Sequence, residues 1–148
     1  MSNTNKIKLI FPSLSENESF ARNVISCFSL KLNPSVSDVA DIKTAVSEAV
    51  TNAIVHGYPN SIGEIVLEAE ICDKELHINI FDNGVGIEDL EQALEPFYTT
   101  KEGEERSGMG FTIMKSFMNE VVVDSKKGCG TKIYMKKIIE DNAKVLNA

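Results

Sequence analysis

The sequence has no tryptophan, only two histidines, and three cysteines that stand far apart. Two histidines exclude a zinc site built from three of them. Because Cys27, Cys72 and Cys129 are odd in number and form no CxxC pair, neither a disulfide framework nor a zinc ribbon is indicated. No apolar run approaches the roughly 18 residues of a membrane span, and no apolar signal segment begins the sequence. These absences favour a soluble, reduced protein of the cytoplasm.

Positive charge is also scarce. The chain has 22 acidic residues against 15 Lys and Arg, a formal net charge of −7 and a pI of about 4.9. This balance disfavours a general nucleic-acid binder, which needs basic residues to neutralise phosphates, but a nucleotide can still bind at a local site. The share of large apolar residues excludes disorder of the whole chain. We expect one domain over residues 1–140 and a frayed tail over residues 141–148.

The apolar pattern predicts five strands and three substantial helices. Alternation predicts strands at residues 6–11, 63–72, 74–82, 121–125 and 131–137. Helical spacing predicts a helix ending near Phe28, a long one at 38–56, a short one at 89–94 and another at 110–119. Ser15 with Glu18 is typical of a capping box, and Gly57 of a helix C-cap. The hairpin order favours an α+β fold, a two-layer α/β sandwich whose mixed, mostly antiparallel sheet is covered by helices on one face.

Glu48 and Asn52 form the first candidate pair. They lie four residues apart on the long helix, off its apolar stripe, so they project from the same side. A carboxylate and an amide oxygen on one face can serve as a base and a metal ligand, and Mg²⁺ needs one or two such oxygens beside a substrate's phosphates. A solvated helix face explains the pair equally well when it is taken alone.

Asp82 to Gly86 and the segment 99–111 carry the other candidates. Asp82 ends a strand, where its carboxylate can accept a hydrogen bond from an exocyclic amine, and Gly84 and Gly86 would allow a planar ring to approach. Ser107-Gly108-Met109-Gly110 runs into a helix, whose first amides suit phosphate oxygens. The hydroxyls and cations just before it could close over a triphosphate; they belong to Thr99, Thr100, Lys101 and Arg106. Gly130-Thr131 lies between the last two strands. Each feature alone also fits an ordinary turn, loop or helix start.

The order of these features resembles one known ATP-binding fold. E-x-x-x-N on a helix, then D-x-G-x-G, a lid, G-x-G opening a helix and a final G-T are similar to the Bergerat fold over residues 38–133. Gyrase-type ATPases, heat-shock-90 chaperones, sensor histidine kinases and MutL proteins share that fold. Within the group, residues 14–22, 47–57 and 106–114 resemble the anti-sigma-factor serine kinases of sporulation. The intact glycines after Asp82 favour this branch over the stress-response relatives.

The resemblance implies ATP and Mg²⁺ as cofactors and gives the residues their roles. Glu48 would be the general base, Asn52 would ligate Mg²⁺, and Asp82 would bind the adenine amino group. Lys101 and Arg106 would assist transfer from the lid. The other implied nucleotide contacts are Gly84, Gly86, Thr99, Thr100, Ser107, Gly108, Met109, Gly110 and Thr131.

The implied function is that of an anti-sigma factor that also phosphorylates a serine on its anti-anti-sigma antagonist. Arg22 resembles an arginine that grips both protein partners, and a homodimer is expected, with the first strand and the N-terminal helix as candidate interfaces. No direct contact with nucleic acid or membrane is expected. Two alternatives stay open: a nucleotide-gated binding module without transfer, and a detached ATP-binding domain of a histidine kinase. Residues 95–101 also resemble that family's lid start, whereas the absence of a preceding phosphoacceptor helix weighs against it.

Overall fold

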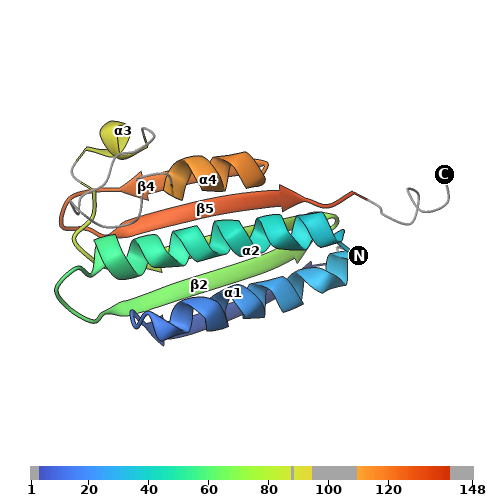
Figure 1. The fold of residues 1–148 in the computed structure, drawn as a ribbon, viewed down its shortest axis with the longest axis horizontal. Coiled ribbons are helices and arrows are strands. Elements are labelled where there is room, and N and C mark those ends of the chain that lie inside the picture. The colour runs from blue at the N-terminus through green and yellow to red at the C-terminus, as the bar shows by residue number, and fades with distance from the viewer. Residues whose placement is uncertain (1–3, 88, 95–109, 141–148) are drawn as a thin grey trace.

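In the part of the chain that the structure describes, five strands form one antiparallel sheet, which is one layer of the fold (Figure 1). The computed structural model describes residues 4–87, 89–94 and 110–140. The strands lie in the order β1-β2-β3-β5-β4, and all four neighbouring pairs are antiparallel. They are β1 (Thr4–Pro12), β2 (Glu64–Cys72), β3 (Glu75–Asp82), β4 (Glu120–Ser125) and β5 (Thr131–Ile138). The predicted strands and the predicted fold class are confirmed.

Among the described residues, three helices cover one face of this sheet (Figure 1). α2 (Val36–Thr51) lies between α1 (Glu16–Ser29) and α4 (Gly110–Phe117) and packs against both. Shorter turns of helix are η1 (Leu30–Leu32), η2 (Asn52–Gly57) and α3 (Leu90–Ala93). Within the part of the chain that is described, no helix combines the length and apolar character needed to cross a bilayer.

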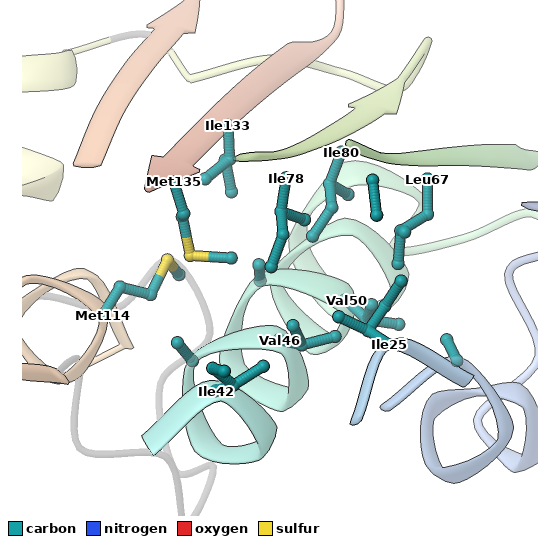
Figure 2. Packing of buried hydrophobic residues seen from close by; sticks show 14 of the residues in the cluster. Ile25, Ile42, Val46, Val50, Leu67, Ile78, Ile80, Met114, Ile133 and Met135 are labelled. Atoms are coloured by element: carbon teal, nitrogen blue, oxygen red, sulfur yellow. The ribbon is translucent and has the colours of Figure 1, made fainter. Parts of the chain in front are cut away.

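The core fills the space between the helices and the covered face of the sheet. Alternate residues of each strand point into it, because side chains of a strand alternate between the two faces. Figure 2 shows Ile42, Val46 and Val50 of α2 facing the apolar side chains of the sheet. The other labelled members of this cluster are Ile25, Leu67, Ile78, Ile80, Met114, Ile133 and Met135. α2 is therefore packed against α1 and α4 on its two sides and against the sheet below.

The start of α1 differs from the prediction. Ser15 has helical backbone angles of φ −59° and ψ −30°, and its side chain makes no capping hydrogen bond to the described residues. A capping side chain needs the extended conformation, so the predicted capping box at Ser15 is wrong. The box occurs instead at α2, where Asp38 N donates to Ser35 Oγ at 3.0 Å and Ser35 N donates to Asp38 Oδ2 at 3.1 Å. Asp at the fourth position, in place of the usual Glu or Gln, hid this signal.

The end of the long helix also differs. Its last six residues, Asn52–Gly57, wind as a π-helix, and Tyr58 N donates to Ala53 O, five residues back, at 3.2 Å. Gly57 therefore lies inside the helix, and the C-cap is Tyr58, so the predicted cap at Gly57 is wrong. Single π-turns are rare and occur frequently at functional sites. This one directs the helix end towards the end of β3.

Candidate functional site

Asp82 is a buried carboxylate at the end of β3. It is 6% exposed, and its Oδ1 accepts a hydrogen bond from Gly84 N at 2.9 Å. Burial raises the pKa of Asp82, while backbone hydrogen bonds from Gly84 and Thr131 oppose the rise. A carboxylate has about four lone-pair positions, so two such bonds leave it able to accept more. The side chain is therefore a hydrogen-bond acceptor with spare capacity at the end of the central strand.

Because Gly57 has no side chain, the carboxylate of Asp82 can pack directly against its backbone. A Cβ on Gly57 would lie 2.9 Å from Asp82 Oδ1 and 3.0 Å from its Cγ, closer than real Cβ contacts. The π-turn thus brings the backbone of the helix end directly against the carboxylate. Sequence reasoning assigned Gly57 to a helix cap and missed this contact, because neither the π-turn nor the approach to β3 has a local signature.

A methyl group on Gly57 should therefore impair the site. We expect Gly57→Ala to weaken ATP binding about 10-fold by displacing the Asp82 carboxylate, and to lower the free energy of unfolding by about 1–3 kcal/mol through overpacking. Titration calorimetry and thermal unfolding measure the two effects. Gly128→Ala is the control, because no described atom lies within 4 Å of its Cβ position, although its φ of +81° strains the backbone. Unchanged ATP affinity in Gly57→Ala would contradict the role in binding that the family resemblance implies for Asp82.

The loop after Asp82 is clamped between two other segments. Val85 N donates to Gly57 O at 2.9 Å, and Gly128 N donates to Val85 O at 2.7 Å. Gly84 passes so close to Gly57 that a Cβ would lie 2.0 Å from its carbonyl oxygen. Gly86 has a φ of +73°, and a Cβ there would lie 2.0 Å from Lys126 O. Both predicted glycines are thus required by backbone packing, a reason independent of any ligand.

Tyr58 and Ser125 hold the same loop, and sequence reasoning missed both. The hydroxyl of Tyr58 accepts from Asn83 N at 2.7 Å and donates to Glu64 O at 2.7 Å. Ser125 Oγ lies 2.7 Å from Thr131 Oγ1 and accepts from Ile87 N at 2.9 Å. An isolated Tyr or Ser carries no motif, so only the strand register, which places Ser125 opposite Thr131, could have pointed to the latter.

Thr131 stands beside Asp82. The two are directly opposed across the β3–β5 pair, and both are 6% exposed on the covered face. Directly opposed side chains of an antiparallel pair have Cβ atoms about 5 Å apart on one face. The structure thus brings together two residues that are 49 positions apart in the sequence, as the predicted base-binding end requires.

Glu48 and Asn52 lie on one side of α2 and its continuation. Both are half-buried, and Asn52 N donates to Glu48 O and Ala49 O, so the helical spacing between the two is kept. A Cβ on Gly110 would lie 3.3 Å from Glu48 Oε2, which places this carboxylate against the first residue of α4. Helix N-termini favour phosphates, and carboxylate or amide oxygens suit Mg²⁺. The donor set therefore fits a nucleotide whose metal is held mainly by its own phosphates.

Other predicted residues lie elsewhere. Thr99, Thr100, Lys101, Arg106, Ser107, Gly108 and Met109 lie outside the described residues. Arg22 is on α1, which flanks α2 on the side away from α4 (Figure 1), so the structure does not bring it to the site. Its Nε lies 3.7 Å from Glu18 Oε1, and neither atom has a hydrogen-bond partner among the described residues. Those residues also contain no cluster of three His, Cys, Asp or Glu that could hold a metal.

Comparisons with known proteins show the family to which this chain is related. A family model described as a histidine kinase-like ATPase domain matches residues 11–137. The chain is 54% identical over 140 residues to an anti-sigma F factor of Clostridium acetobutylicum, which covers 93% of this chain and 98% of that protein. It is 55% identical over 134 residues to an anti-sigma F factor of Clostridium perfringens, covering 90% and 96%.

A solved structure supports the fold. The RsbU and RsbW domains of a Mycobacterium tuberculosis protein superpose with a TM-score of 0.65 at 18% identity, covering 91% of this chain and 32% of that one. The predicted resemblance is confirmed by the sequence relatives and the family model together. This chain belongs to the histidine kinase-like ATPases and, within them, to the anti-sigma F factors.

Proposed function

We propose that this anti-sigma factor binds ATP with Mg²⁺ and transfers the terminal phosphoryl group to a serine of a protein antagonist. One observation carries the proposal. α2 and its π-turn connect the two ends of the site, since Glu48 lies against the start of α4 and Gly57 lies against Asp82. The helix and its π-turn therefore contact both candidate ends: α2 carries Glu48, and Gly57 packs against Asp82 at the end of β3.

The base end would hold adenine through Asp82. Its spare lone pairs would accept a hydrogen bond from the exocyclic amine, and a buried, largely desolvated carboxylate makes such a bond stronger than in water. The loop carrying Gly84 and Gly86 is held by backbone hydrogen bonds on both sides, so it need not rearrange when the base binds. Affinity follows from this preorganisation.

At the phosphate end of the site, the residues around Glu48 would position the attacking serine hydroxyl and remove its proton. Phosphoryl transfer depends mainly on positioning and on charge stabilisation. Bound Mg²⁺ would supply neutralisation of the phosphate charge, with Asn52 as its protein ligand. Glu48 would accept the proton of the attacking serine hydroxyl, and the first amides of α4 would face the phosphates. Lys101 and Arg106 would complete the lid.

The test is transfer of label from γ-labelled ATP. The chain, Mg²⁺ and its anti-anti-sigma partner are mixed, and acid-stable label on a partner serine supports the kinase. Binding of ATP without transfer would favour a nucleotide-gated binding module. Acid-labile label would favour a histidine kinase, because phosphohistidine is hydrolysed in acid and phosphoserine is not.

The protein partners would be a sporulation sigma factor and the anti-anti-sigma substrate, since the relatives are named anti-sigma F factors. A homodimer is also proposed, with β1 and α1 as candidate interfaces. Sigma factors act on RNA polymerase, so the proposed function places the chain in the cytoplasm. The domain boundary at residue 140 is part of the same proposal.

Arg22→Glu should weaken binding of both protein partners while ATP affinity stays unchanged. Arg22 is partly exposed on α1, and α1 lies on the side of α2 away from α4, so the charge reversal should leave the nucleotide residues unchanged. Repulsion from Glu18, four residues away, adds about 0.5 kcal/mol of helix destabilisation. Pull-down of each partner measures the effect. Lys74→Glu, an exposed charge reversal in the β2–β3 turn, is the control, and unchanged capture of both partners by Arg22→Glu would refute the assignment.

A further inference from the structure

Ser125 joins three segments at the base end of the site. Its hydroxyl accepts from Ile87 N at 2.9 Å, donates to Gly130 O at 3.0 Å and lies 2.7 Å from Thr131 Oγ1. These partners belong to the loop after β3, to the turn before β5 and to β5 itself. Ser125 ends β4 and is half-buried. Two of these partners adjoin Asp82, because Thr131 is opposed to it across the sheet and a Cβ on Gly130 would meet its carbonyl oxygen.

One arrangement of the hydroxyl hydrogens satisfies all three contacts. A hydroxyl has one hydrogen and two lone pairs. Gly130 O can only accept and Ile87 N can only donate, so all three contacts are hydrogen bonds at once only when the hydrogen of Ser125 goes to the carbonyl. The remaining contact then requires Thr131 to donate to Ser125. The hydrogen of Thr131 is thereby used inside the protein, and what Thr131 offers a ligand is a pair of lone pairs.

Thr131 and Asp82 consequently form a pair of acceptors. They are opposed across β3 and β5 on the same face, and both are nearly buried. A group lying between them must donate two hydrogen bonds. The amino group at position 6 of adenine has two hydrogens, whereas the oxygen at position 6 of hypoxanthine has none and would face acceptors alone. A buried acceptor left without a donor costs about 1–3 kcal/mol.

We propose that Ser125 is a positioning residue that sets base selectivity: by taking the hydroxyl hydrogen of Thr131, it makes this end of the site select a 6-aminopurine over a 6-oxopurine. The inference rests on the proposed nucleotide binding and adds to it the residue that controls the base preference. Ser125 acts through Thr131 and does not itself reach the base.

The experiment compares two nucleotides that differ at this position. Titration calorimetry of the whole chain with Mg²⁺ gives the affinities for ATP and for inosine triphosphate. In Ser125→Ala the hydroxyl of Thr131 is free to turn and donate to the 6-oxo group, so the ratio of the two affinities should fall about 10-fold. Ser125→Cys fills the same space with a weak hydrogen-bonding group and should shift the ratio in the same direction. Ser125→Thr keeps the hydroxyl and should restore the wild-type ratio.

A serine away from the site provides the control. Ser116 is exposed on α4 and donates to Thr112 O at 2.9 Å, so Ser116→Ala should leave the ratio unchanged. Equal loss of affinity for both nucleotides in Ser125→Ala would show a merely structural role and overturn the inference. So would an unchanged ratio. If the wild-type chain binds neither nucleotide, the proposed function itself fails, which is a different result.

Discussion

Replacing Glu48 with Gln should lower the rate of phosphoryl transfer by about 10²- to 10⁴-fold and leave ATP affinity within about 2-fold. Gln keeps the size and shape of Glu, so the contact of this side chain with Gly110 at the start of α4 is preserved. The neutral amide cannot accept the proton of the attacking serine. A loss confined to transfer therefore identifies a general base, whereas a loss of binding would identify a structural group.

The same substitution elsewhere on the chain controls for the change of charge. Glu68 lies on β2, on the face of the sheet opposite the helices, where it forms an ion pair of 3.0 Å with Lys6. Glu68→Gln should transfer phosphate at the wild-type rate. Single-turnover measurement with γ-labelled ATP and the anti-anti-sigma partner compares the variants. If Glu48→Gln keeps full transfer, the base assignment is wrong and a nucleotide-gated binding module becomes the better description.

Periodicity was enough to predict most of the fold. Buried and less buried residues alternate along the whole of β2 and β3, and apolar and polar residues follow this alternation apart from Val66 and Phe81–Asp82, because one face of the sheet packs against helices and the other does not. The stripe of Ile42, Val46 and Val50 identified α2 for the same reason. These patterns reflect burial of whole elements, which averages over many residues.

The ends of elements were harder to predict, because they depend on single contacts. Ser15 and Ser35 are both serines before an apolar stripe, but Ser35 alone has the extended backbone that a cap requires. The π-turn of Asn52–Gly57 arises where the helix meets Asp82, a residue 25 positions beyond Gly57. No local pattern contains that information.

Some residues of the candidate site could likewise be predicted from the sequence, and others could not. Glu48 and Asn52 could be paired from sequence because helical spacing alone places them together, whereas Thr131 needed the family resemblance to be placed beside Asp82. Ser125 and Tyr58 act through hydrogen bonds to backbone atoms, and such contacts follow from tertiary folding rather than from residue type. The residues that were missed are therefore those that position the predicted ones.

Replacing Asp82 with Asn should weaken ATP binding by about 100-fold. The carboxylate now accepts from Gly84 and Thr131 and keeps lone pairs for the ligand. An amide of the same shape has one oxygen, so its NH₂ group must face either the backbone donors or the adenine amine. Either way a buried donor loses its acceptor, at a cost of about 1–3 kcal/mol beyond the lost charge.

Titration calorimetry measures the affinity, and Asp124→Asn, at an exposed position of β4, should bind ATP normally. Retained affinity in Asp82→Asn would remove Asp82 from the base site.

The wild type and Asp82→Asn can also be compared without any ligand, which tests how burial affects the charge of Asp82. Burial raises the pKa of this carboxyl above its ordinary value of 3.8, so the folded chain binds more protons than the unfolded chain between the two values. The free energy of unfolding of the wild type, measured relative to Asp82→Asn, should therefore fall as the pH rises through that window and stay level above it. Denaturant unfolding at a series of pH values measures this difference. A difference that rose with pH would mean that hydrogen bonds to the charged form outweigh its burial. The expected fall means that the ligand-free fold carries a destabilising charge at neutral pH, which is the condition under which a bound amine donor stabilises it most.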